Sequence, residues 1–448
     1  MINRGLFLIA VLCGALITTS VEAQPSLDAL IDREMVSLVE AYKTLHAAPE
    51  LSHCEEKTSA FLAGALRSAG YAVTERVGKY NRYGWVGYGV VAVLKNGEGP
   101  TVLVRSDMDA LPVEEKTGLP YASKVKTKND AGQDVSVMHA CGHDIHIASL
   151  IGTARALAQF RDRWRGTLVL IGQPAEEIGA GAGAMLKDGL YTRFPRPDYA
   201  LALHANAELE AGKVGYCLGY ALASVTSVDV IVRGIGGHGS KPETTRDPVV
   251  VAAQAVLALQ TIVSREVSPL DPAVVTVGSI HGGTKHNIIP DEVKLQITVR
   301  AYKEEVRQKV LASIERIVRG VALAAGVPDT LAPVVDASGE FTPSTYNDLR
   351  LTGRLAGVFE KAFGRENVVQ WSPIMAGEDF GRYSLDGNQV PTCLFWLGAA
   401  DPAKVAEGKR TGTPLPYLHS SAFAPAPEPT VRAGVKAMTS AVLELMKK

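Results

Sequence analysis

MHACGHDIH, residues 138–146, is the stretch around which the rest of this chain is organised, because it holds three histidines and one cysteine within eight positions. His139, Cys141 and His143 stand at every second position, so an extended backbone would direct all three side chains the same way. The run Ile147–Phe160 that follows is apolar and rich in alanine, which predicts a helix. A thiolate beside imidazoles at the start of a helix suits a borderline transition metal. A buried cysteine among histidines placed by chance is the alternative interpretation.

The length and charge of the chain set limits on its architecture and partners. With 448 residues it is too long for one ordinary core, so two domains are expected. The formal net charge is −1 and no basic run has the density that nucleic-acid binding requires. We therefore expect no nucleic-acid partner.

The N-terminus has the pattern of a secretory signal. Arg4 precedes the apolar run Leu6–Thr19, and Val21 and Ala23 are the small residues of a cleavage site. We expect a signal peptide at 1–23 and an exported protein, periplasmic or secreted. No other run approaches ~18 apolar residues, so we expect no membrane contact after signal removal.

Four cysteines remain after the signal, namely Cys54, Cys141, Cys217 and Cys393. Export exposes them to an oxidising compartment, where four cysteines can form two disulfides. Their spacing is wide, however, and a chain of this size needs no such cross-links. We expect Cys141 to be a metal ligand and the other three to be buried thiols, with one disulfide among those three left open.

Strands and helices alternate on both sides of the quoted stretch, which predicts an α/β fold with a mostly parallel sheet and helices on both faces. Three expected strands, Thr101–Arg105, Thr167–Gly172 and Tyr199–Leu203, each run directly into polar or charged residues. Because parallel strands end at the same edge of a sheet, those residues should lie together.

The pattern changes between residues 221 and 335. The expected elements are a strand, a helix, two strands, a helix and a strand, at Val225–Val232, Pro248–Ser264, Ala273–Ile280, Glu292–Arg300, Glu304–Ala325 and Pro333–Val335. This is the split βαβ order of a ferredoxin-like α+β domain. We expect residues 221–335 to be a satellite domain inserted into a catalytic domain made of 24–220 and 336–448.

Five residues are candidate metal ligands because each follows a strand or lies in a turn beside one. They are Cys141, His143, Glu177, His204 and His419. Five ligands exceed the four of a single structural zinc, so either one is spare or two metals share the set. A thiolate is the natural bridge between two such ions.

Glu176 and Glu177 are the second strong signal. Adjacent carboxylates repel each other unless a cation neutralises one of them. One can bind metal while its neighbour takes a proton from a metal-activated water and later delivers it to the leaving nitrogen. A solvated acidic pair is the alternative, and the position of the pair at the end of an apolar strand disfavours it.

These residues belong to nine motifs through which the chain closely resembles the M20 metallopeptidase family, in particular its amidohydrolase branch (subfamily D) of N-acyl-amino-acid, hippurate and auxin-conjugate hydrolases. The motifs are His46–Ser52 (HAAPELS), Arg105–Pro112 (RSDMDALP), Met138–Asp144 (MHACGHD), Gln173–Glu177 (QPAEE), Leu203–Asn206 (LHAN), Gly234–Pro242 (GIGGHGSKP), His286–Val293 (HNIIPDEV), Gly377–Phe380 (GEDF) and Leu418–Phe423 (LHSSAF). Arg105 and Cys141 stand where more distant peptidase branches carry a histidine and a bridging aspartate, which places the chain in the amidohydrolase branch.

The resemblance implies a role for each matching residue. Cys141 matches a thiolate that bridges two divalent ions (Zn, Mn, Co or Ni), and Glu176 matches the catalytic base. The remaining metal ligands are matched by His143, Glu177, His204 and His419. His238 matches a residue that holds the substrate carbonyl, often across a dimer, and Asn287 one that helps to hold the substrate. The inserted domain is the dimerisation domain of the family, so a homodimer is expected.

The expected function is that of an exported, metal-dependent amidohydrolase acting on N-acyl amino acids or small conjugates. Two rivals are a dipeptidase or carboxypeptidase acting on short peptides, and a metal- or solute-binding protein without turnover. His139 and His146 are interpreted as structural, and one of Asp107 and Asp109 as orienting a ligating histidine. The charged segment Lys124–Asp134 either borders the substrate cleft or is a solvated loop.

Overall fold

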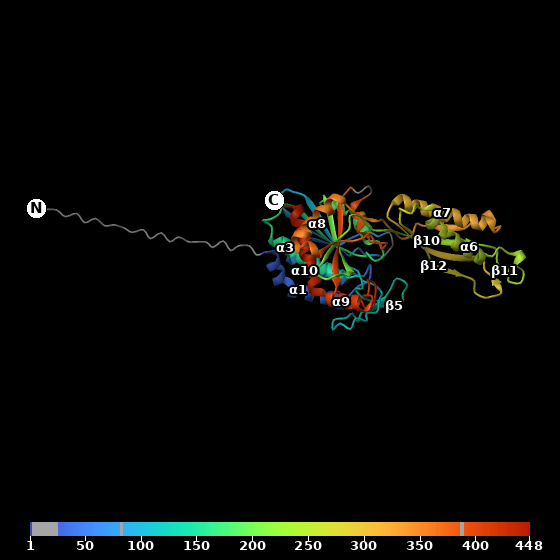
Figure 1. Ribbon diagram of the computed structural model, residues 1–448, viewed down its shortest axis with the longest axis horizontal. Helices are drawn as coiled ribbons and strands as arrows, with labels where there is room; N and C mark the ends of the chain where they lie inside the picture. Colours follow the sequence, from blue (N-terminus) through green and yellow to red (C-terminus); the bar gives the residue numbers. More distant parts are fainter. Residues whose placement is uncertain (2–25, 81–83, 386–388) are drawn as a thin grey trace.

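The computed structural model describes Met1 and residues 26–80, 84–385 and 389–448. The expected signal peptide, apart from Met1, lies outside the described residues. Figure 1 shows two bodies: a larger one built around a long sheet, and an elongated one that projects from it.

The larger body contains an eight-stranded sheet in the order β1-β2-β6-β3-β7-β19-β8-β18. Its strands are β1 (Ala72–Val77), β2 (Gly89–Asn96), β6 (Gly166–Gln173), β3 (Thr101–Asp107), β7 (Tyr199–Glu210), β19 (Thr392–Ala400), β8 (Val214–Tyr216) and β18 (Val368–Gln370). The central run from β6 through β3 and β7 to β19 is parallel, and the antiparallel pairs flank it. The predicted mostly parallel sheet is confirmed.

Both faces of this sheet are buried, as the continuous apolar strand sequences predict. Alternate residues of a strand point to opposite faces, so Val102 and Val104 of β3 join one hydrophobic cluster and Leu103 joins another. Helices α1 (Leu27–Ala47), α3 (His143–Gln159) and α10 (Pro427–Leu445) pack together over the first face. The short helix α4 (Gly181–Lys187) lies over the second.

The turn before α3 determines where the side chains of residues 138–146 lie. Gly142 has a φ of +85°, a left-handed conformation that glycine adopts without strain, and α3 begins at the next residue, His143. The backbone is therefore not extended all the way from His139 to His143, so the condition under which the three side chains would share one direction is not met. The turn instead places Cys141 ahead of the helix and His143 in its first turn, both buried.

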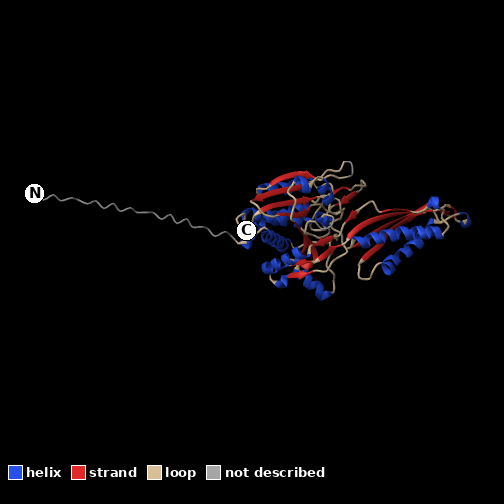
Figure 2. Ribbon diagram, turned by 90° about the horizontal axis from the view of Figure 1, so that it is seen from above, coloured by secondary structure: helices blue, strands red, loops and turns tan. Residues whose placement is uncertain are grey.

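The elongated body contains a five-stranded antiparallel sheet in the order β12-β14-β10-β15, with β16 also paired to β10. The strands are β10 (Ser224–Arg233), β12 (Ala273–Gly282), β14 (Glu292–Ala301), β15 (Val334–Asp336) and β16 (Phe341–Thr342). Helices α6 (Pro248–Thr261) and α7 (Glu304–Ala324) cover one face of this sheet (Figure 2) and share a hydrophobic cluster with it. β16 lies beyond residue 335, so the sheet extends past the expected end of the insertion.

Three smaller expectations are wrong. The segment Lys124–Gln133, whose polar sequence is typical of an exposed loop, instead contributes to a short hairpin of β4 (Lys126–Lys128) and β5 (Asp134–Ser136). Cys54 is exposed rather than buried, because it lies in the turn between α1 and the next helix. Pro248–Glu266 is long and apolar enough to cross a membrane by length and composition, although 33% of it is buried in this fold.

The four cysteines of the described residues are all free thiols, so no disulfide joins them. Cys141, Cys217 and Cys393 are buried as expected.

Candidate metal centre and active site

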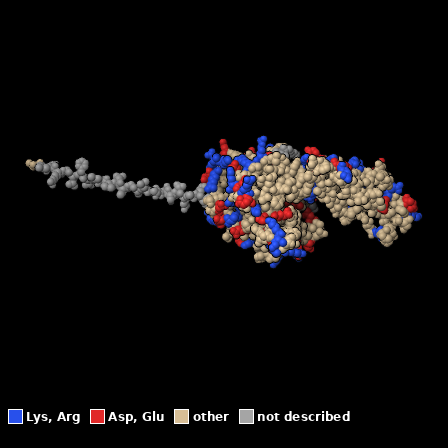
Figure 3. All heavy atoms as spheres, viewed as in Figure 1, with Lys and Arg blue, Asp and Glu red and all other residues tan. Residues whose placement is uncertain are grey.

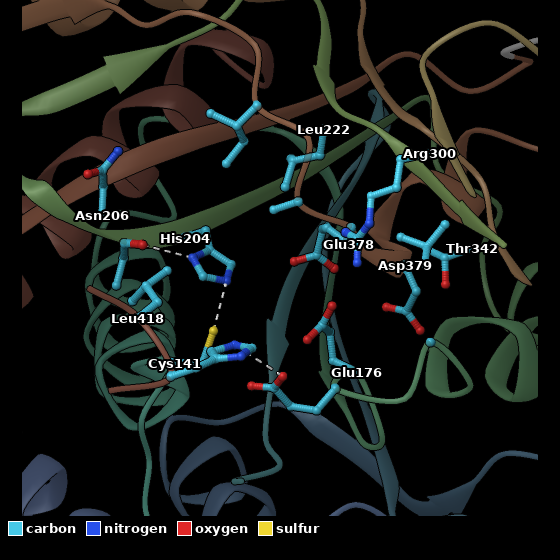
Figure 4. A pocket seen from close by; sticks show the side chains of 18 of the residues that line it. Cys141, Glu176, His204, Asn206, Leu222, Arg300, Thr342, Glu378, Asp379 and Leu418 are labelled. Carbon is cyan, nitrogen blue, oxygen red and sulfur yellow. Dashed lines mark hydrogen bonds and ion pairs between the residues drawn. The ribbon is translucent and has the colours of Figure 1, made fainter. Parts of the chain in front are cut away.

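A cavity of about 430 Å³ lies where the central strands of the large sheet end. β3 ends at Asp107, β6 ends three residues before Glu176, and β7 carries His204. Cys141, Glu177, His204 and His419 all line the cavity (Figure 4 labels Cys141, Glu176 and His204 within it). The structure therefore brings together residues that the sequence spreads over nearly three hundred positions.

The ligand atoms fall into two groups that share Cys141. Cys141, His143 and His204 offer atoms within 4.8 Å of one another, and so do Cys141, Glu177 and His419. Cys141 Sγ lies 3.6 Å from His204 Nε2, and His419 Nε2 lies 3.4 Å from Glu177 Oε2. A sulfur common to both groups is the arrangement expected of a bridging thiolate.

His143 is held with one ring nitrogen free for a ligand. Its Nδ1 donates to the carbonyl oxygen of Asp109 at 2.8 Å, which leaves Nε2 as the acceptor nitrogen. Nε2 lies 3.8 Å from Glu177 Oε1, and both atoms are buried without a hydrogen-bond partner. Buried polar atoms are normally satisfied, so a cation between these two atoms fits the donor set. Burial opposes a charged ring, but Asp107 and Asp109 raise the pKa of His143 to about 10, so a cation that binds Nε2 would displace a proton from it.

Asp109 positions Glu177, the second of the two adjacent glutamates, as well as His143. Its Oδ2 accepts hydrogen bonds from Ser52 Oγ at 2.6 Å and from the backbone amide of Glu177 at 3.0 Å. Asp107 instead accepts from His146 Nδ1 at 2.6 Å, and His146 Nε2 accepts from the amide of Ala205 at 2.8 Å. Both aspartates thus orient groups of the centre, and His146 lies behind it.

Glu176 is a buried carboxyl facing other carboxyls. Burial, followed by the nearby Glu378 and Glu177, raises the pKa of Glu176 well above its usual range. Its Oε2 lies 3.9 Å from His143 Nε2, and its side chain points toward Glu378 in Figure 4. A carboxylate in such surroundings holds a proton readily, which is what general acid–base catalysis requires.

The sequence interpretation gave no catalytic or binding role to Arg105, Glu378 and Asp379, which the structure places beside Glu176. Arg105 is fully buried and its guanidinium reaches Asp107, Glu378 and Asp379. The only available signal was the acidic pair inside the GEDF motif. Arg300 on β14 was also missed; it lines the cavity, donates to the carbonyl of Met375 at 3.0 Å and forms no ion pair within the described residues.

The structure does not bring His238 and Asn287 to this cavity. His238 lies on β11 (Gly237–His238), which pairs with β13 (Ile288–Ile289) directly after Asn287. Both residues are exposed, and β11 lies at the outer end of the elongated body (Figure 1). The ten residues of β10 alone span about 33 Å between the large body and that end. Within one chain the two residues and the cavity are therefore separate.

Several known proteins resemble this chain over most of its length. The model of peptidase family M20/M25/M40 matches residues 103–410. The chain is 37% identical to the N-acetyl-L-cysteine deacetylase of Bacillus subtilis, over 82% of each chain, and 34% identical to thermostable carboxypeptidase 1 of Saccharolobus solfataricus, over 82% of this chain and 87% of that one. Among solved structures, a dinuclear metal-binding peptidase of family M20 from Bacillus subtilis superposes with a TM-score of 0.73 at 27% identity, covering 93% of this chain and 99% of that chain.

Proposed function

Because the chain belongs to peptidase family M20/M25/M40, we propose that it is an exported, metal-dependent amidohydrolase that cleaves the amide bond of N-acyl amino acids or related small conjugates. The observation that carries this proposal is the convergence of Cys141, Glu177, His204, His419 and the buried Glu176 on one cavity, with His143 within ligand reach of Cys141 and His204. The similar deacetylase supports an acyl group as the part released. The expected signal peptide supports export.

We propose that two divalent ions are held by Cys141 together with the other four candidate ligands, which are His143, Glu177, His204 and His419. Thiolate, imidazole and carboxylate together suit zinc, manganese, cobalt or nickel. Bound at these residues, the ions would lower the pKa of a water molecule and polarise the amide carbonyl.

The Glu176 carboxylate acts as the base in this proposal. It takes a proton from the attacking water and passes it to the nitrogen of the departing amine, so that one group serves both steps. Its position among Glu378 and Glu177 keeps its proton affinity high enough for the second transfer. Glu378 and Asp379 in turn are held by Arg105, which fixes the surroundings of the base.

Arg300 is the residue best placed to hold the carboxylate of an amino-acid substrate. Its guanidinium points into the cavity from above in Figure 4 and forms no ion pair with any described residue. The planar fork of an arginine matches a carboxylate with two parallel hydrogen bonds.

We propose that the protein is a homodimer in which the satellite body joins the two chains. β12 is an edge strand with unpaired backbone groups. Helix α6, which packs on the same sheet, exposes the apolar side chains of Val249, Val250 and Leu257, and Val263 just after it is exposed as well. Much of the face of this body seen in Figure 3 carries few charged side chains. Such a dimer gives His238 and Asn287 a route to the partner's cavity, where His238 would donate to the carbonyl oxygen as charge develops.

The similar carboxypeptidase supports a second candidate, in which the substrate is a short peptide. One experiment separates the two. Metal content and hydrolysis are measured on the same purified sample before and after chelation, with N-acetyl and N-benzoyl amino acids beside dipeptides. About two metals per chain, with N-acyl substrates preferred and activity restored by metal, is the expected result. Preference for dipeptides favours the peptidase, and metal without turnover on any substrate overturns both.

A further inference from the structure

A second cavity, of about 660 Å³, lies beside the catalytic one. Gly179 and Glu340 line both cavities, so the two spaces adjoin along these residues. Gly179 follows the Glu176–Glu177 pair by two positions, which puts the shared boundary next to the proposed base. A substrate longer than the catalytic cavity can therefore extend in this direction.

The boundary between the two cavities depends on a glycine. Gly179 has a φ of +65°, and a Cβ at this position would lie 2.3 Å from Thr342 Oγ1. Any side chain would be strained in the backbone and would collide with the facing wall. Because Gly179 has no side chain, its backbone can lie close to Thr342 while the passage between the two cavities stays open.

Three aromatic side chains contribute to the walls of the second cavity. Tyr80, Trp85 and Phe341 line it, and Trp85 stacks on His53 with ring centroids 3.4 Å apart. Ile178 also lines it and is 36% exposed, although it directly follows Glu177. Exposed apolar side chains beside aromatic rings are the usual lining of a site for small organic molecules.

Arg382 is the cation that can receive an anion in the second cavity. Lys79 and Lys187 also line it, against Asp130 and Glu340, but Lys79 Nζ already lies 3.1 Å from Asp188 Oδ1. Arg382 donates to the carbonyl of Phe341, its Nε is buried without a hydrogen-bond partner, and it forms no ion pair within the described residues. Burial lowers the pKa of Arg382, and the nearby carboxyl of Asp379 offsets this effect only in part. The carboxylate of Glu340, by contrast, already accepts a hydrogen bond from Ser227 Oγ at 3.0 Å.

We propose that the second cavity is a subsite for the distal part of an elongated substrate, an aromatic group that carries a carboxylate, while the scissile amide lies in the catalytic cavity. The aromatic ring packs against Phe341 and Trp85, and the carboxylate pairs with Arg382. Asp130 belongs to the β4–β5 hairpin, so that charged segment borders this subsite. The inference rests on the proposed amidohydrolase function, whose catalytic cavity it extends.

The test compares kcat/KM for matched substrates on the intact protein. N-acetylalanine is the short substrate. Phenylacetyl and 4-carboxyphenylacetyl groups replace acetyl in one series, and phenylalanine and 4-carboxyphenylalanine replace alanine in the other. In the wild type we expect one of the two series to be preferred over N-acetylalanine by about tenfold, with the carboxylated member highest.

Substitutions then assign the preference to named residues. Phe341→Ala should reduce the ratio of extended to short substrate about tenfold, and Phe341→Leu should reduce it less. Arg382→Gln should remove the advantage of the carboxylated member only, and Arg382→Lys should restore part of it. Arg350→Gln, an exposed arginine on the helix Leu349–Phe363, is the matched control. Circular dichroism establishes that each variant is folded.

The outcomes separate this inference from the proposed function. Hydrolysis of N-acetylalanine with no preference for either extended series overturns the subsite and leaves the amidohydrolase standing. A preference that Phe341→Leu and both Arg382 variants leave unchanged places the distal group elsewhere and also overturns the subsite. Failure to hydrolyse any member of the panel overturns the inference together with the function on which it rests.

Discussion

Arg105 and Glu378 form a fully buried ion pair with Nη2 and Oε1 2.8 Å apart, although 273 positions separate them in the sequence. The same guanidinium bonds to Asp107 on its own strand and to Asp379. Asp107 in turn holds His146, and Glu378 faces Glu176. The Arg105 guanidinium therefore links the metal side of the cavity to the carboxylates around the proposed base. The residues of the inserted body separate these two groups in the sequence but not in space.

Replacing Arg105 by Met should destabilise the protein by about 3–5 kcal/mol, because it leaves three buried carboxylates without their cation. Arg105→Lys should be intermediate, since an ammonium keeps the charge but cannot bond to all of these groups with a rigid fork. Urea denaturation followed by circular dichroism measures the change. The exposed Arg350→Gln should change stability by no more than ~0.5 kcal/mol. A similar small change for Arg105→Met would show that the buried cluster adds nothing to stability.

Replacing Glu176 by Gln should lower kcat by at least about 10²-fold, because an amide cannot take the proton of the attacking water. Metal content should stay near that of the wild type, since Glu176 is not among the five proposed ligands. Glu177→Gln is the matched control one position away, and it should lower metal affinity as well as kcat. Atomic absorption and initial rates on the same samples measure both quantities. Wild-type turnover in Glu176→Gln would remove the base assignment.

His238→Ala should slow turnover without loss of metal, and a mixed dimer can show where this residue acts. Chains carrying Glu176→Gln and chains carrying His238→Ala are co-expressed with different affinity tags, and the mixed dimer is purified. If His238 serves the partner's cavity, one site of the mixed dimer has both an intact Glu176 and an intact His238. We therefore expect about half of the wild-type activity per dimer. A mixed dimer as inactive as the two parent variants would place His238 in the cavity of its own chain.

Part of the candidate site was predictable from the sequence, because the parallel strands β6 and β7 bring Glu177, which follows β6, and His204, which lies within β7, to one cavity. The contacts of Arg105 were not predictable in this way. The contacts of Arg105 with Glu378 and Asp379 depend on where the chain rejoins the large sheet after the inserted body, and no local sequence pattern predicts that position. Gly142 shows a different limit: its left-handed turn separates Cys141 from the helix that begins at His143, and the composition of the motif does not reveal that turn. Cys54 was misjudged because cysteine is usually buried, whereas this one lies in a turn.

The position of His238 relative to the cavity could not be predicted from the sequence around it either. Its motif identified a candidate, but the ten-residue strand that carries it away from the cavity decides which cavity it can reach. In the proposed homodimer, the symmetry between the two chains would bring His238 to the cavity of the partner.

His46 gives a prediction on pH dependence outside the metal ligands. Its Nδ1 lies 2.7 Å from Asp144 Oδ2 and its Nε2 lies 3.1 Å from Glu115 Oε1. Burial opposes the charged ring, but these two carboxylates outweigh it and raise the pKa of His46 to about 10. In the unfolded chain the pKa returns to about 6.5. The stabilisation from this raised pKa is therefore complete below pH ~6.5 and is lost as the pH rises through about 10.

Between these two pH values the folded protein keeps a proton that the unfolded chain releases, so the free energy of unfolding should fall by on the order of 1 kcal/mol per pH unit from this group. His46→Gln retains hydrogen-bonding groups but cannot titrate, so its stability should vary less steeply over the same range. Urea denaturation of both proteins at pH 6.5, 8 and 9.5, with the same metal content, measures the two slopes. Equal slopes would mean that His46 is neutral in the folded protein and that Asp144 and Glu115 are stabilised by other groups.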